Sequence, residues 1–283
     1  MKLFSNKYLD MNYETFNPHP NLEAIIKCHW ILEVPASSEN SKQRIIPDGC
    51  IEMCFILGED VKRYTSETEY IIQPRAMVFG QITKPYFIEP TGYVDTFAVR
   101  FFPYGFANFI TKSIHELADT ETPLTSLFEE NSALELEQKV IAAPSTASRI
   151  EVVERFLLDR LKDQQVIDNI VTTTIDALSR TKGNEPINSI LKKDLSKRRN
   201  LERKFSKQVG ISPKQLGRII RLQAALKLIL NNKGEKLTLI AYESEYYDQA
   251  HFNKDFKEFT GTNPKEYFTD EELILSALIY SKD

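Results

Sequence analysis

The chain has 283 residues, of which 42% are hydrophobic and 27% charged, and it contains no low-complexity tract. This composition is typical of a folded soluble protein, and the length favours two domains over one. Its apolar runs are far shorter than the roughly 20 residues of a membrane span. The first residues contain no continuous apolar region that would direct secretion, and the three cysteines (Cys28, Cys50 and Cys54) lack paired spacing. We therefore expect a cytoplasmic protein without a membrane partner.

Charge is divided unevenly along the chain. The net charge is −4, yet residues 181–268 contain 18 Lys and Arg against 10 Asp and Glu, whereas residues 1–180 contain 17 against 26. Within residues 190–221 there are 11 basic residues and 2 acidic ones. Such asymmetry is typical of a nucleic-acid-binding domain joined to one that does not bind nucleic acid. Taken alone, the basic run could also be an ordinary solvated helix face.

Residues 1–110 predict short strands separated by turns. Three segments are rich in β-branched and aromatic residues and are bounded by Gly and Pro, namely 50–57, 76–79 and 94–102. One early helix is expected over 22–30, because Asn21 can cap it after Pro20.

From Tyr104 to about Leu161 the apolar spacing becomes helical, and a further helix is expected from Val166 to Arg180. A stop at Gly183 followed by Pro186 marks a domain boundary. The expected division is 1–110 as a β-rich domain, 111–183 as a helical linker region, and 184–283 as a basic helical domain that would bind nucleic acid.

One pattern occurs twice in the C-terminal part, 51 residues apart. Leu201, Phe205, Gly210 and Pro213 return at the same spacing as Phe252, Phe256, Gly261 and Pro264. A spacing of four puts two apolar residues on one helix face, Gly suits a left-handed helix stop, and Pro suits the first turn of the next helix. The repeat predicts two helix-turn-helix units built from helices over 187–193, 198–209, 238–244 and 248–260. A linker helix from Ser212 to about Leu230 would span roughly 28 Å, enough to set the units about one turn of DNA apart.

The second helix of each unit would enter the major groove. Its exposed residues are the candidate DNA-binding residues: Arg198, Arg199, Glu202, Arg203 and Lys207 in the first unit, and Gln249, Ala250, His251, Asn253 and Lys254 in the second. Arg can bond guanine through two donors, Glu can accept from cytosine, Gln and Asn can pair with adenine, and Lys suits phosphate or guanine. His251 could equally be an ordinary surface residue.

The segment from Leu237 to Tyr267 resembles the signature of the AraC/XylS family of bacterial transcription regulators. The first unit, from Arg199 to Gln215, is similar to that family's first helix-turn-helix. The resemblance covers about 187–268 and implies two helix-turn-helix units that read adjacent major grooves. The sequence departs from the family pattern in the turns and in the first unit, at Leu191, Leu195, Lys197 and Glu245, where Glu245 replaces the usual turn glycine.

The N-terminal part is similar to an uncharacterised sensor-like domain common in such regulators. The resemblance rests on four segments: 19–22, 28–30, 46–50 and 97–103. It implies a small cupin-like β-barrel followed by dimerisation helices. The expected fold class is therefore α+β, with this barrel joined to an all-α pair of helix-turn-helix units.

The barrel could be a sensor or an enzyme. The histidines of this part, His19, His29 and His115, form no His-x-His pair, whereas cupin enzymes hold a metal with clustered His and carboxylate. Cys50 and Cys54 share one strand face, but two thiols without a nearby His make a poor zinc set, and buried core cysteines are the simpler interpretation. We expect no metal, no cofactor, no catalytic residue and no enzymatic activity. The alternative is a metal-dependent or Cys-based enzyme fused to a DNA-binding domain.

Four residues are candidate effector contacts. Trp30 would report occupancy of the barrel, Asp48 lies in a turn that could contribute to a pocket, and Arg75 and Arg100 could anchor an anionic effector. Either Arg could instead be a surface or ion-paired residue. The expected partners are double-stranded DNA, a small-molecule effector, RNA polymerase and a second copy of the chain. A protein-interaction adaptor that no longer binds DNA is a further alternative, which the basic excess disfavours.

Overall fold

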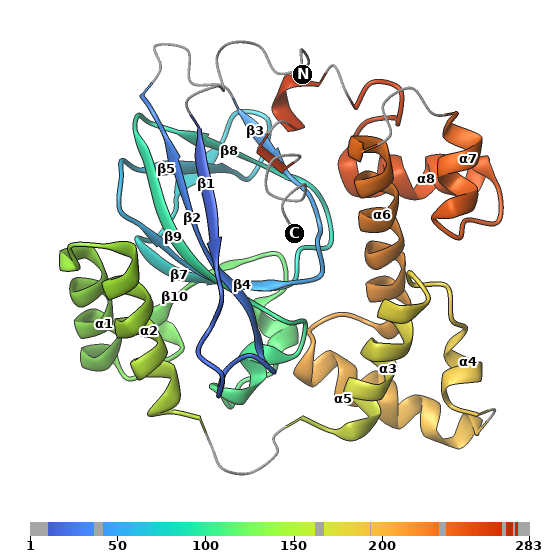
Figure 1. Cartoon of the computed structure of the whole chain (residues 1–283), viewed down its shortest axis with the longest axis horizontal. Coiled ribbons are helices and arrows are strands. Elements are labelled where there is room, and N and C mark those ends of the chain that lie inside the picture. The colour runs from blue at the N-terminus through green and yellow to red at the C-terminus, as the bar shows by residue number, and fades with distance from the viewer. Residues whose placement is uncertain are drawn as a thin grey trace.

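The structure is a computed structural model that describes residues 11–36, 42–161, 167–192, 194–231, 236–267, 270–273 and 275–276. Its N-terminal part contains two antiparallel sheets that face one another, and its C-terminal part is helical (Figure 1). This arrangement confirms the expected α+β class. Within the described residues, no helix is long and apolar enough to cross a membrane.

The larger sheet has six strands in the order β1 (Asn12–Phe16), β2 (Ile26–Val34), β9 (Val94–Phe101), β4 (Ile51–Ile56), β7 (Ala76–Phe79) and β10 (Glu121–Pro123). The smaller sheet has four, in the order β3 (Gln43–Ile45), β8 (Tyr86–Pro90), β5 (Val61–Tyr64) and β6 (Tyr70–Ile72). The predicted strands at 50–57, 76–79 and 94–102 are confirmed as β4, β7 and β9.

The helix expected over 22–30 is wrong. Only one turn forms there, where the amide of Ile26 donates to the carbonyl of Leu22 at 2.8 Å. From Ile26 the chain is strand β2, which pairs with β1 on one side and β9 on the other. Both faces of this central strand are buried, so its continuous apolar run gave no strand-like alternation.

The region expected to be helical from Tyr104 begins instead with three 3-10 turns, η2 (Gly105–Asn108), η3 (Ile114–Leu117) and η4 (Leu124–Ser126), and strand β10. Because β10 pairs with β7, the sheet extends past residue 110 to Pro123. Two α-helices follow, α1 (Glu130–Ala142) and α2 (Thr146–Leu158), which pack on each other beside the large sheet (Figure 1). The Nε2 atom of His29 on β2 lies 3.0 Å from Oε1 of Glu154 and joins α2 to that sheet.

The C-terminal helices are α3 (Asn169–Arg180), α4 (Ile187–Ile190), α5 (Arg198–Gln208), α6 (Pro213–Asn231), α7 (Leu237–Glu243) and α8 (Gln249–Thr260), with 3-10 turns η5 (Leu195–Lys197) and η6 (Glu271–Leu273). Apart from a shorter α4, the helices of the two predicted units have bounds within one residue of those expected, and they are confirmed. Helix α3 packs against α5 and α6, so its contacts lie with the DNA-binding helices.

Candidate DNA interface and ligand cavity

Helix α5 buries one face and exposes the other, as the spacing of its apolar residues requires. Leu201 and Phe205 are fully buried. The five candidate DNA-binding residues on this helix, Arg198, Arg199, Glu202, Arg203 and Lys207, are all exposed. Within this set, Arg198 pairs with Glu202 at 3.2 Å, and Nη2 of Arg203 donates to Oδ1 of Asn200 at 3.0 Å. The helix thus presents a basic surface with one carboxylate.

Helix α8 carries the second candidate surface. Asp248 caps it by accepting a hydrogen bond from the amide of His251 at 2.7 Å. Among the candidates, Ala250, Asn253 and Lys254 are exposed, whereas Gln249 and His251 are half-buried. The ring of His251 meets the ring of Tyr246 edge-on, with 5.5 Å between centroids. His251 therefore has a packing role beside any contact with DNA.

Each unit turns through a residue with a left-handed backbone. In the second unit this residue is Glu245, with φ of 62°, at the position where the family has glycine. In the first unit it is Lys192, with φ of 51°, rather than Leu195 as expected. The first turn is longer because the 3-10 turn η5 lies between Lys192 and α5. The two units are thus related but not identical repeats.

Arg218 on α6 fixes the position of α8. Its Nη2 lies 2.7 Å from Oδ1 of buried Asp255 and 2.6 Å from Oε2 of Glu258. The guanidinium also stacks on Phe259, with 4.7 Å from Cζ to the ring centroid. These bonds lower the pKa of Glu258 below its ordinary value. Arg218 therefore ties the linker helix to the second recognition helix through charge-assisted hydrogen bonds.

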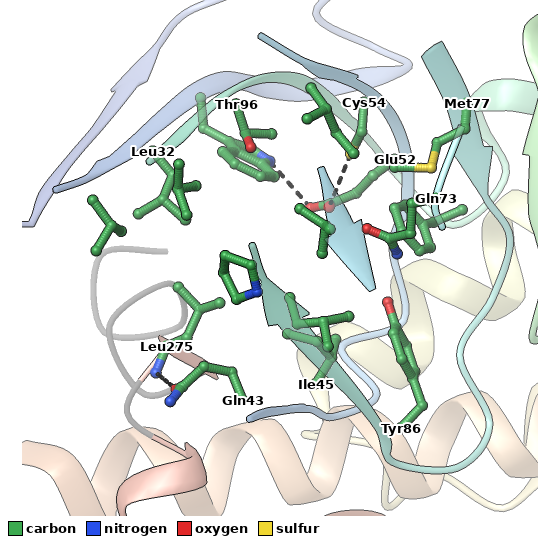
Figure 2. A pocket seen from close by; sticks show the side chains of 18 of the residues that line it. Leu32, Gln43, Ile45, Glu52, Cys54, Gln73, Met77, Tyr86, Thr96 and Leu275 are labelled. Carbon is green, nitrogen blue, oxygen red and sulfur yellow. Dashed lines mark hydrogen bonds between the residues drawn. The ribbon is translucent and has the colours of Figure 1, made fainter. Parts of the chain in front are cut away.

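A cavity of about 180 Å³ lies between the two sheets (Figure 2). Its walls are mainly apolar side chains from both sheets, among them Leu32, Ile45, Ile56, Val61, Met77 and Ile88. Leu275, from the segment that follows the second helix-turn-helix, completes the lining beside Gln43. The amide of Leu275 donates to Oε1 of Gln43 at 3.2 Å. One wall of the cavity therefore belongs to the C-terminal part of the chain.

The polar end of the cavity is organised around Glu52 on β4. Its Oε1 accepts from Nε of Arg100 at 2.7 Å and from Nε1 of Trp30 at 3.1 Å. Asp48 lies 3.8 Å from the Arg100 guanidinium. Burial raises the pKa of Glu52, although Arg100 opposes this shift. Burial beside Glu52 also raises the pKa of Cys54, which remains a thiol.

The structure brings three of the four predicted effector contacts, Trp30, Asp48 and Arg100, to the cavity wall. Arg75 lies elsewhere: its guanidinium binds Asp60 at 2.8 Å, and its side chain is 41% exposed. Arg75 is therefore the surface, ion-paired residue of the alternative interpretation.

Sequence reasoning missed Glu52, Tyr86 and Leu275. A signal for Glu52 existed, because it stands between Cys50 and Cys54 on the strand face that they share. No comparable signal places Leu275 against the sheets. Within the described residues, no group of three or more His, Cys, Asp or Glu side chains could hold a metal ion.

Comparisons with known proteins bear on both parts. Residues 196–270 match the family model of a helix-turn-helix domain, and residues 14–123 match a domain of unknown function (DUF6597). The sequence matches no curated protein.

Among solved structures, ToxT from Vibrio cholerae is similar with a TM-score of 0.50 at 12% identity, over 93% of this chain and 99% of that one. ToxT with an unsaturated fatty acid bound has a TM-score of 0.45 at 12% identity, over 91% of this chain and 94% of that one. The cupin domain of Schizosaccharomyces pombe Cnp3 has a TM-score of 0.24 at 14% identity, over 32% of this chain and 61% of that one. At such identities these likenesses concern the fold.

The C-terminal match covers the recognition helix of the first unit, the linker helix and the whole second unit, and it begins after α4. The family model, the geometry of the two units and the fold shared with ToxT agree with the signature seen in the sequence. The chain therefore carries a helix-turn-helix domain of the AraC type at residues 196–270 and is a DNA-binding transcription regulator.

Proposed function

We propose that the N-terminal domain senses a small molecule and that occupancy of the cavity controls how the DNA-binding domain is held. The observation that carries this proposal is the lining of the cavity, in which Leu275 of the C-terminal part stands among side chains of both sheets. A molecule in the cavity would touch both parts of the chain.

Arg44 on β3 connects the cavity wall to the second helix-turn-helix. Its Nη1 donates to the carbonyl of Thr260, the last residue of α8, at 3.1 Å, and to Asp270 at 2.9 Å. Its Nη2 also pairs with Glu272, and its own carbonyl accepts from Oγ of Ser276 at 2.6 Å. Strand β3 thus holds both ends of the segment that carries Leu275. A shift of Leu275 would strain the contacts that hold the end of α8.

Further contacts join the barrel to the first unit and the linker helix. Nδ1 of His115 lies 2.9 Å from the carbonyl oxygen of Gly210, and Nε2 of Gln223 donates to the carbonyl of Pro47 at 2.6 Å. Gly49 packs against Leu216, where an added Cβ would come within 3.0 Å of a methyl group. Because both units are held against the barrel, the domain can set their spacing on DNA.

The test uses the full chain and DNA fragments taken from sites bound in the cell. Compounds that raise the melting temperature are then assayed for their effect on DNA affinity, with Leu275→Ala as the coupling variant. We expect such a compound to change the affinity of the unmodified chain and to change that of the variant less. Compounds that bind but leave the DNA affinity of the unmodified chain unchanged would contradict control by the cavity.

We also propose that the chain acts as a homodimer and contacts RNA polymerase. Leu134 and Ile141 on α1 are 42% and 47% exposed, and their separation of seven places them on one helix face, which supports a helical dimer contact. Sedimentation of the chain and of Leu134→Glu tests the dimer.

Tyr242 and Tyr247, 78% and 94% exposed beside α8, support a contact with polymerase. Transcription in vitro tests that contact.

An enzymatic barrel remains the competing proposal. Metal analysis of the purified chain and a turnover assay on compounds that bind decide between the two. Stoichiometric metal or turnover would favour the enzyme.

A further inference from the structure

The charge of the cavity lining restricts what can bind there. Among the described residues that line it, one is basic, Arg100, and two are acidic, Asp48 and Glu52. Both acidic groups lie on the same side as Arg100, at 3.8 Å and 2.6 Å from its Nη2. With all three ionised, this end of the cavity has an excess of negative charge.

Arg100 is already occupied by Glu52. Its Nε and Nη2 both contact Oε1 of Glu52, and its side chain is 2% exposed. An anionic head group would have to displace this buried pair and would then leave a carboxylate without its partner. Breaking a buried pair in this way is strongly unfavourable. We therefore do not expect Arg100 to act as the anion anchor that the sequence suggested.

The two oxygens of Glu52 differ in their contacts. Oε1 accepts hydrogen bonds from Arg100 and Trp30, whereas within the described part of the chain Oε2 faces only the Cys54 thiol, at 3.9 Å. A thiol at that distance is a weak donor. Oε2 is therefore an acceptor on the cavity wall whose bonding capacity is largely unused (Figure 2).

Tyr86, on the smaller sheet, supplies a second polar group to the cavity that Glu52 lines from the larger sheet. It extends from β8 into the cavity, where its hydroxyl makes no hydrogen bond to any described residue (Figure 2). Burial raises the pKa of Tyr86 well above its ordinary value, and the charges of Glu121 and Glu52 raise it further. The hydroxyl is consequently a neutral group that can donate to or accept from a ligand.

The volume limits the size of the occupant. An engineered cavity of about 150 Å³ with apolar walls takes one benzene molecule, and the cavity here, at about 180 Å³, is slightly larger. We propose that this cavity selects a mainly apolar molecule, about one aromatic ring and a short arm in size, whose head group donates a hydrogen bond to Glu52 and carries no negative charge. The inference rests on the sensing role proposed above and specifies its ligand class.

Three compounds of matched shape test the proposal: phenylacetate, 2-phenylethanol and 2-phenylethylamine. Their affinities for the full chain are measured by titration calorimetry at pH 7.5. We expect the alcohol or the amine to bind at least tenfold more tightly than the acid. If the amine leads, Glu52 binds as a carboxylate, and if the alcohol leads, the site prefers a neutral donor.

Glu52→Gln removes the charge but keeps the shape, and it should reduce the preference over phenylacetate to less than threefold. Glu14→Gln, at an exposed position on β1, changes the net charge equally and should leave the preference intact. If Glu52→Gln fails to fold, the ranking on the unmodified chain decides alone.

The proposal is overturned if phenylacetate binds most tightly or if none of the three binds at millimolar concentration. DNA affinity measured in parallel separates this inference from the sensing role. If the compounds bind in the expected order but do not change DNA affinity, the ligand class is supported and sensory control is contradicted. If phenylacetate binds most tightly and changes DNA affinity, the ligand class is contradicted and sensory control is supported.

Discussion

At the scale of single residues, the two recognition helices expose different chemistry. Among the candidate contacts, α5 presents three arginines, one glutamate and one lysine, whereas α8 presents two amides, one lysine, one histidine and one alanine. Guanidinium and carboxylate groups suit G·C pairs, and amides suit adenine. The two units are therefore expected to read half-sites of different base composition.

Arg203→Ala and Gln249→Ala should each cost about 1–3 kcal/mol on the cognate site and little on random DNA, because both side chains are expected to meet base edges. Lys207→Ala should weaken both kinds of binding, because an exposed Lys near the end of α5 is placed for phosphate. Affinities for cognate and random fragments, measured at one salt concentration, check this. An equal loss on both fragments in all three variants would refute the base-reading assignment.

His29 makes the stability of the barrel depend on pH. It is fully buried, and burial lowers its pKa below 6.5, although Glu154 at 3.0 Å opposes the shift. Below pH 6.5 the unfolded chain takes up a proton that the folded chain resists, so the free energy of unfolding falls as pH decreases. Urea denaturation between pH 7.5 and 5.5 should show a smaller decrease in His29→Gln than in the unmodified chain. Equal slopes would exclude His29 as a source of pH dependence.

Side chains at the cavity show what one sequence can and cannot reveal about a site. Strand alternation placed Cys50 and Cys54 on one face, and Glu52 lies on that same face. The alternation does not say that this face lines a cavity rather than a packed core. That depends on the spacing of the two sheets, which contacts distant in sequence determine.

At the scale of elements, local signals were sufficient where a helix has apolar residues at helical spacing and a clear start or stop signal, such as the Ser212 and Asp248 caps of α6 and α8 or the glycine after α5. Helices α5, α6 and α8 were predicted within a residue for this reason. Strand β2 was misread because it is buried on both faces, and β10 was missed because three residues leave no pattern. Both strands are determined by their partners in the sheet.

Glu245→Gly should stabilise the second unit by about 0.5–1 kcal/mol. The residue holds φ of 62°, a left-handed conformation that Gly adopts without the steric cost of a Cβ atom. Its side chain is exposed and contacts Asn184 at 3.3 Å, so little is lost. Lys257→Gly, at an exposed position inside α8, is the matched control and should destabilise by about 1 kcal/mol. Urea unfolding of both variants, followed by the circular dichroism of the helices, measures the change in unfolding free energy. Destabilisation by Glu245→Gly would refute the strain argument.

At the scale of the whole molecule, the packing of α3 bears on where the two parts divide. The sequence placed the boundary at residue 183, after this helix. In the structure, Val171, Ile175 and Leu178 are buried on α3, which packs against α5 and α6. Gln208 on α5 also donates to Asp168 at 2.8 Å, just before α3 begins. We therefore propose that the DNA-binding unit starts near residue 167.

Two fragments test this boundary. Residues 167–283 should melt cooperatively and bind DNA, whereas residues 184–283 should be less stable by several kcal/mol, because each fully buried aliphatic side chain of α3 contributes about 1.5–3 kcal/mol. At Gly183 the end of α3 approaches Gly217 of α6 so closely that a Cβ added at Gly183 would clash with the Gly217 carbonyl, and this contact is also lost from the shorter fragment. For the longer fragment, the logarithm of DNA affinity should fall with the logarithm of salt concentration, with a slope of about −0.9 per phosphate neutralised. Equal melting temperatures for the two fragments would contradict a boundary near residue 167 and favour one at residue 183. A folded longer fragment without DNA affinity at low salt would instead show that the helical units need the barrel to bind DNA.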